Sequence, residues 1–148
     1  MRVTLDTNVL VSAFISKQGN PARILDIVTT LDEISLLLSK EILDEFRDVL
    51  SRTDVSERFQ YSKQDIEEYI AAIRGVATII KVESNFKVVK DDPNDDIILE
   101  TAVDGKADFL VSGDRHLREI KSFRNVRIVS PRQFLAIIAR NFGELISS

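Results

Sequence analysis

Two aspartates stand at places where a buried strand would be expected to end. Asp6 follows the apolar run "VTL", and Asp114 comes just after "FLVS". An aspartate directly after a strand is most often a helix N-cap, whose side chain accepts hydrogen bonds from exposed backbone N–H groups. A functional acid would occupy the same place, so position alone leaves both interpretations of Asp6 open.

Helical geometry singles out two more acids. Residues 39–52 predict an amphipathic helix in which successive residues rotate by about 100°. Glu45 then lies at the edge of the apolar stripe, whereas Asp44 points nearly the opposite way. In the helix expected from "DDIILETAV", Asp95 falls among apolar residues and Asp96 lies roughly 100° further round. We therefore expect Glu45 and Asp95 to face the interior.

The acids of this last stretch also have a structural explanation. Asp92, Asn94 or Asp95 could cap the helix that follows, and Pro93 could set a turn. The spacing alone leaves these alternatives open beside a functional role.

Four converging carboxylates would repel one another and raise their apparent pKa values, and a divalent cation removes that conflict. The chain has no cysteine and one histidine, His116. Oxygen ligands without Cys or a His cluster suit Mg²⁺ or Mn²⁺ and disfavour zinc. A lone histidine excludes metal-free hydrolysis by a histidine acid/base pair. The chemistry that remains is metal-assisted phosphoryl transfer.

These acids need a scaffold, and the pattern of apolar residues predicts one. Strands are expected at residues 2–5, 34–38, 108–112 and 126–129, with a weaker one at 78–82. Helices are expected at 20–31, 39–52, 62–75, 95–103 and 130–142, the first with Asn20 as N-cap and the third with a capping box from Ser62 to Asp65. This alternation indicates a parallel sheet with helices on both faces, whose ligand site lies outside the carboxyl ends of the strands.

The composition fits one domain spanning residues 1–148. The chain carries 20 Lys and Arg against 24 Asp and Glu, a net charge of −4. No apolar run approaches the roughly 18 residues that a membrane span needs, and no secretory signal pattern opens the chain. We expect a cytoplasmic soluble protein without a membrane partner.

Basic residues gather in one segment despite the acidic balance. Residues 115–132 contain six Lys or Arg against Glu119 alone. Arg115, Arg118 and Lys121 are weak candidates for contacts to an RNA backbone, and a solvated face is the alternative. His116 is expected at the surface. Phe59 and Tyr61 of the segment 52–62 either stack on bases from a mobile loop or, as we favour, pack against a neighbouring helix.

The order of these motifs resembles a known family. "LDTNVLVSAF", "LSKEILDEFRDVL" and "DPNDDIILETAVDGKADFLVSGDRHL" together resemble the PIN-domain ribonucleases, in particular the branch described as toxins of toxin–antitoxin pairs. The resemblance extends from Arg2 to about Phe134.

The resemblance also implies roles for single residues. The acids of the family fall on Asp6, Glu45, Asp95 and Asp114, which would be both catalytic and metal-binding. Asn8, Ser112 and Asp96 fall where side chains would orient those carboxylates. The sequence departs from the family pattern at two positions. Asp96 stands where many relatives have Asn or an apolar residue, so the family's aspartate could be either Asp95 or Asp96. Ser112 stands where many relatives have Thr, which keeps the hydroxyl.

What the resemblance implies for the whole protein is specific. The expected fold is a PIN-like three-layer α/β/α sandwich around a parallel sheet of four to five strands. The expected activity is endonucleolytic cleavage of single-stranded RNA with one or two Mg²⁺ or Mn²⁺ ions. The expected partners are a cognate antitoxin protein and a second copy in a homodimer.

Three other functions stay open from the sequence. A related nuclease could act on structured RNA or DNA, and a binding module could keep the fold without the metal. A haloacid-dehalogenase-like phosphatase would need a second aspartate two residues after Asp6, where this chain has Asn8.

Overall fold

A six-stranded sheet forms the centre of the molecule. The computed structural model describes residues 1–86 and 93–146, without the side chains of residues 93 and 94. The strands are β1 (Arg2–Leu5), β2 (Ser35–Ser39), β3 (Thr78–Ile80), β4 (Phe109–Val111), β5 (Ser122–Phe123) and β6 (Val126–Val129). Their order across the sheet is β3-β2-β1-β4-β6-β5.

All strands run parallel except the short edge strand β5, which pairs antiparallel with β6. Leu5 of β1 pairs with Val111 of β4, and Val111 pairs with Val129 of β6. These three strands therefore end level with one another, so residues that follow them meet at one edge of the sheet, called here the carboxyl edge.

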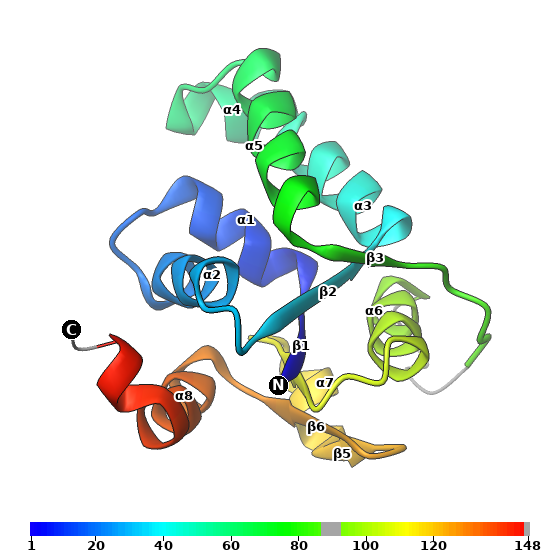
Figure 1. Cartoon of the computed structure of the whole chain (residues 1–148). Helices are drawn as coiled ribbons and strands as arrows, with labels where there is room; N and C mark the ends of the chain where they lie inside the picture. Colours follow the sequence, from blue (N-terminus) through cyan, green and yellow to red (C-terminus); the bar gives the residue numbers. More distant parts are fainter. Residues whose placement is uncertain (87–92, 147–148) are drawn as a thin grey trace.

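Helices cover the sheet on both sides. They are α1 (Thr7–Ile15), α2 (Asn20–Thr30), α3 (Lys40–Leu50), α4 (Thr53–Phe59), α5 (Lys63–Val76), α6 (Pro93–Asp104), α7 (Arg115–Ile120) and α8 (Pro131–Ile146). Figure 1 shows α1, α2 and α8 on one side of the sheet and α6 on the other. This arrangement confirms the expected three-layer α/β/α sandwich. The sheet differs from the expectation in having six strands rather than four to five, and β5 makes it mixed rather than wholly parallel.

The strands are buried because helices cover both of their faces. Val3, Leu5, Leu37, Leu38 and Leu110 are fully buried, which explains why these strands appear in the sequence as continuous apolar runs rather than alternating ones. The runs at 2–5 and 126–129 coincide with β1 and β6, and the others match β2, β3 and β4 within two residues at each end.

Local signals set most helix starts as expected. Ser39 caps α3, and Ser62 and Asp65 form the predicted capping box of α5. Ser130 and Gln133 make a reciprocal pair of the same kind at the start of α8. These side chains satisfy backbone N–H groups that a helix leaves without partners.

The structure differs from the sequence-based picture in some local details. The prediction of Asn20 as N-cap was wrong: Gly19 is the N-cap of α2, because the helix begins one residue early and Asn20 lies within it. The segment 52–62, for which a mobile loop was the less favoured alternative, is mostly the helix α4. The strand β5 was not predicted, since two residues are too few to show a pattern.

An aromatic cluster joins the helices α1, α3 and α5. Phe14 packs edge-on against Phe46, Tyr61 and Tyr69, with ring centroids 6.2, 4.9 and 4.9 Å away. The Tyr61 hydroxyl donates a hydrogen bond to the backbone oxygen of Leu50, 2.7 Å away. Tyr61 therefore packs against its neighbours as favoured, whereas Phe59 is exposed.

In the part of the chain that the structure describes, no helix is both long and apolar enough to span a membrane.

Candidate active site

Asp6 lies at the carboxyl edge and is almost completely buried, with 2% of its surface exposed. It is the N-cap of α1, and its Oδ1 accepts a hydrogen bond from the Asn8 backbone N–H at 3.2 Å. Its Oδ2 accepts a hydrogen bond from the Ser112 hydroxyl at 2.5 Å. One oxygen thus caps the helix and the other accepts from Ser112. The capping role of Asp6 is therefore compatible with a second, functional role.

Ser112 connects Asp6 to the segment that follows β4. Its hydroxyl donates to Asp6 and accepts a hydrogen bond from the Asp114 backbone N–H at 3.0 Å. The Asp114 carboxylate accepts from the His116 backbone N–H at 2.7 Å and caps the short helix α7. The side chain of Asp114 is half-buried and that of Ser112 is fully buried, so one hydroxyl holds the ends of β1 and β4 in a fixed relation.

Glu45 reaches the same edge from α3. The Thr7 hydroxyl, one residue after Asp6, donates a hydrogen bond to Glu45 Oε2 at 3.0 Å. Glu45 is half-buried, whereas Asp44 is exposed and pairs with Lys40 and Arg47 at 3.0 and 3.3 Å. Glu45 and Asp44 are thus oriented as the helical wheel predicted, because the apolar face of α3 packs on the core.

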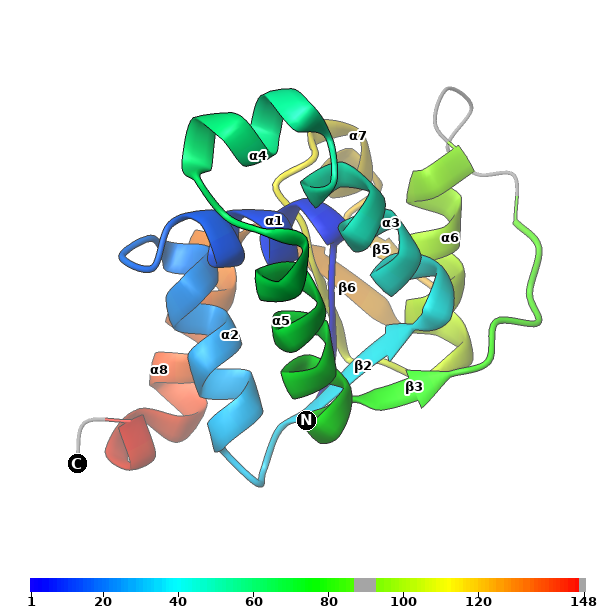
Figure 2. The ribbon, with the colours of Figure 1, turned by 90° about the horizontal axis from the view of Figure 1, so that it is seen from above.

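Asp95 lies in the first turn of α6, the helix that contacts β1, β2, β4 and α3. Figure 2 shows the start of α6 and the helix α7 at the end of the sheet where β1 passes into α1. Asp95 is 4% exposed, as its place among apolar residues predicted. Because α6 begins at Pro93, Asp95 lies inside the helix and does not cap it. The alternative caps Asp92 and Asn94 lie outside the described residues and side chains.

Asp96 is also buried, which corrects the expectation that Asp95 alone faces the interior. Its exposed fraction is 8%. The helical wheel places it 100° from Asp95, but α6 is covered around much of its surface, so two adjacent residues can both be enclosed. Carboxylates in the first turn of a helix also interact favourably with its macrodipole.

A buried acid that the sequence did not single out is Glu100. It is 7% exposed and follows Asp96 by four residues on the same face of α6. Its Oε1 accepts a hydrogen bond from the Phe86 backbone N–H at 3.0 Å. Burial raises the pKa of Glu100; that hydrogen bond opposes the rise, and the nearby Asp96 adds to it. The sequence signal that could have identified Glu100 is its spacing of four residues from Asp96, which places both acids on one face of the helix.

Other expected site residues lie differently. Asn8 contacts Asp6 through its backbone, and its side chain is exposed. Among the residues that the structure describes, no contact supports an orienting role for its amide. Arg115, Arg118 and Lys121 are exposed on and after α7, as is His116. Arg115 forms an ion pair with Glu119 at 3.1 Å.

Ser112 therefore connects the Asp6 carboxylate to the Asp114 backbone, and Thr7 places Glu45 beside the residue that follows Asp6. Asp95 comes from the adjoining helix α6. Within residues 1–86 and 95–146, no three acidic or histidine side chains are grouped closely enough to hold a metal ion as they stand. The side chains present suit a hard divalent ion, because carboxylate oxygens are ligands that Mg²⁺ and Mn²⁺ prefer.

The fold and the acid edge define a class of α/β/α proteins with carboxylates at the carboxyl ends of a parallel sheet. The family model of the PIN domain matches residues 2–116. The chain therefore belongs to the PIN-domain family, a family of nucleases.

One relative and one solved structure of similar fold accompany this finding. The uncharacterized protein MJ1680 of Methanocaldococcus jannaschii is 26% identical over 145 residues, which covers 91% of this chain and 90% of the relative. The solved structure of VapBC2 from Rickettsia felis, bound to a DNA fragment from their promoter, superposes with a TM-score of 0.63 at 17% identity. It covers 88% of this chain and 98% of that one, and at this identity it shows a common fold.

Proposed function

We propose that this protein is a metal-dependent endoribonuclease that cleaves single-stranded RNA. The observation that carries the proposal is the buried Asp6 at the carboxyl edge, held by Ser112 and adjoining the Thr7–Glu45 hydrogen bond. Burying a carboxylate costs free energy of folding, so its presence favours a functional role. Membership of a nuclease family points to phosphodiester hydrolysis as that function.

The metal ligands in this proposal are Asp6, Glu45, Asp95 and Asp114, which would hold one or two Mg²⁺ or Mn²⁺ ions. A bound divalent ion polarises a phosphate oxygen and lowers the pKa of an attacking water.

The chain supplies orientation. Ser112 fixes one oxygen of Asp6, and Thr7 fixes one oxygen of Glu45, so each carboxylate keeps a defined direction before any ligand binds. The Asn8 backbone N–H holds the second oxygen of Asp6. The buried Asp96, in the same turn of α6, helps to orient the Asp95 carboxylate in this proposal.

The proposal extends to protein partners. The solved neighbour is VapBC2 bound to promoter DNA, and by analogy we infer that this chain is the toxin of a toxin–antitoxin pair and binds a cognate antitoxin. We also infer a homodimer, which light scattering of the purified protein will test.

The test is cleavage of an end-labelled single-stranded RNA in EDTA, Mg²⁺ or Mn²⁺. We expect cleavage with metal and a loss of about 100-fold or more in Asp6→Asn, Glu45→Gln and Asp95→Asn. Asparagine is as good an N-cap as aspartate, so Asp6→Asn should keep the fold, which circular dichroism will check.

Two matched controls sharpen the experiment. Asp44→Asn removes an exposed acid beside Glu45 and should leave cleavage unchanged. Asp96→Asn, compared with Asp95→Asn, decides which of the two adjacent acids is the ligand. Turnover like that of wild type in Asp6→Asn would refute the mechanism. If the wild-type protein cleaves no RNA in any metal but still binds Mn²⁺, generic RNA is excluded as the substrate. The proposed metal site would then still stand.

A further inference from the structure

A polar hollow of about 590 Å³ lies between the end of α7, the strand β6 and the first turn of α8. β5 pairs with β6 at Val126 and Arg127, and the Ile128 N–H donates to the backbone oxygen of Lys121 at 2.8 Å. The hollow lies beside this end of the β6 edge. Its polar side chains are Arg118, Lys121, Ser122, Arg127 and Gln133, and among the described residues no acidic one lines it.

The positive charges of this hollow are not neutralised by ion pairs. Within the described residues, no salt bridge involves Arg118, Lys121 or Arg127. On the same helix, Arg115 is paired with Glu119. Three cations beside one another on a chain of net charge −4 repel each other until an anion joins them, so the hollow is suited to an anionic ligand.

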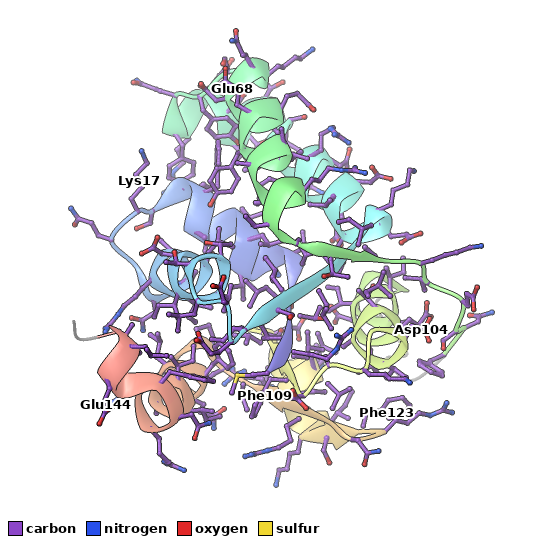
Figure 3. All side chains as sticks on the ribbon, in the orientation of Figure 1. Lys17, Glu68, Asp104, Phe109, Phe123 and Glu144 are labelled. Carbon is purple, nitrogen blue, oxygen red and sulfur yellow. The ribbon has the colours of Figure 1, made fainter. Side chains whose placement is uncertain are left out.

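Two of the side chains are already positioned as hydrogen-bond donors. The Arg127 guanidinium lies 5.4 Å from the centroid of the Phe109 ring, which is labelled in Figure 3. The Gln133 Oε1 accepts from the Ser130 backbone N–H at 2.9 Å, which leaves the amide NH₂ of Gln133 for a ligand. A planar guanidinium and an amide donor suit the oxygens of a phosphate.

The backbone at Lys121 is strained. Its φ is 66° and its ψ is −51°, a conformation that glycine adopts easily and that other residues adopt at a cost in free energy. Lys121 keeps this conformation at the lining of the hollow, where its ammonium adds a third positive charge.

We propose that this hollow binds a phosphate group of the single-stranded RNA substrate, an inference that rests on the proposed function. The helix α7 begins directly after Asp114 and ends directly before Lys121; six helical residues span about 9 Å. A strand anchored in the hollow can therefore extend to the acids of the carboxyl edge. Of the RNA contacts expected from the sequence, the hollow keeps Arg118 and Lys121. Arg127 takes the place of Arg115.

The experiment measures RNA binding separately from cleavage. A fluorescein-labelled single-stranded oligoribonucleotide is titrated with the protein in EDTA, and the anisotropy yields Kd at several salt concentrations. We expect the double variant Arg118→Gln/Arg127→Gln to raise Kd by about 10-fold and to reduce the slope of log Kd against log salt by about 1.4.

The control is Arg74→Gln/Arg140→Gln, which removes two exposed arginines elsewhere and should leave Kd within about twofold. Lys121→Gly provides an independent readout, because it relieves the strained backbone. We expect its Tm to rise while its Kd for RNA rises as well.

Equal effects of the two double variants, or a wild type that binds no RNA, would overturn the inference. Displacement of RNA by poly-glutamate from wild type but not from Arg118→Gln/Arg127→Gln would assign the hollow to an acidic protein segment instead, which also overturns it. Because binding is measured without metal, loss of RNA affinity in the double variant supports the hollow even if the cleavage assay refutes the nuclease.

Discussion

Single residues at the carboxyl edge combine two roles that position alone presents as alternatives. Asp6 is both an N-cap and a buried acid, because its two oxygens accept from different donors, the Asn8 backbone and the Ser112 hydroxyl. Asp114 likewise caps α7 while its own backbone N–H donates to Ser112. A capping signal in a sequence therefore does not exclude a functional acid.

Glu100 leads to a prediction about pH. Burial raises its pKa, and a carboxyl with a folded pKa above its unfolded value stabilises the fold only while it is protonated. That stability is complete below the unfolded pKa, about 4.3, and is lost as the pH rises through the folded pKa. We expect Glu100→Gln to be more stable than wild type at pH 7, by on the order of 1 kcal/mol or about 3 °C in Tm.

The same substitution should make no difference below about pH 4, where both proteins carry a neutral side chain. Thermal unfolding across this pH range is the measurement, with the exposed Glu57→Gln as control. A loss of stability at pH 7 would show instead that the Glu100 carboxylate is needed in its charged form.

At the scale of elements, helix packing carries the acids to the carboxyl edge. α3 places Glu45 beside Thr7, and the aromatic cluster ties α3 to α1 and α5. An exposed ion pair, Arg47 with Glu67 at 2.6 Å, adds a second link between α3 and α5, which contributes little in water. The aromatic contacts should dominate the stability of this layer.

We therefore predict a large loss of stability in Phe46→Ala. Phe46 is fully buried and stacks on Tyr69 with ring centroids 5.9 Å apart. The cavity should cost about 3–5 kcal/mol in the free energy of unfolding, measured by urea denaturation. Val76→Ala, at a residue 54% exposed, should change it by about 0.5 kcal/mol or less. A cost of less than about 1 kcal/mol for Phe46→Ala would mean that this layer is not held by its rings.

At the scale of the whole molecule, the fold brings acids from residues 6, 45, 95 and 114 toward one edge of an already acidic protein. Such convergence is a cost to the free protein, because like charges repel. A cation that binds only the folded state should reduce this cost and shift the folding equilibrium.

Mn²⁺ is accordingly predicted to raise the Tm of the wild-type protein. At a concentration about 100 times Kd, binding adds about 2.7 kcal/mol, or roughly 5–10 °C for a chain of this size. Asp6→Asn should lose most of this shift and Asp44→Asn should retain it, as read by differential scanning fluorimetry. Equal shifts in both variants would point to non-specific binding at the acidic surface.

The sequence determined the layers of this molecule by itself. Continuous apolar runs are typical of strands covered on both faces, and the amphipathic period of α3 separated Glu45 from Asp44 correctly. These features depend on neighbours within a few residues, so a local pattern is enough to predict them. The buried side of α6 was harder to predict, because α6 packs against β1, β2, β4 and α3, most of which are distant from it in sequence.

Only the tertiary structure decided which side chains meet. The Ser112–Asp6 hydrogen bond joins residues 106 positions apart, and Thr7 reaches Glu45 across 38. The hollow beside β6 likewise brings together Lys121, which precedes β5, and Gln133 of α8. Such contacts follow from strand register and helix packing, which depend on the whole chain at once, and no local spacing contains them.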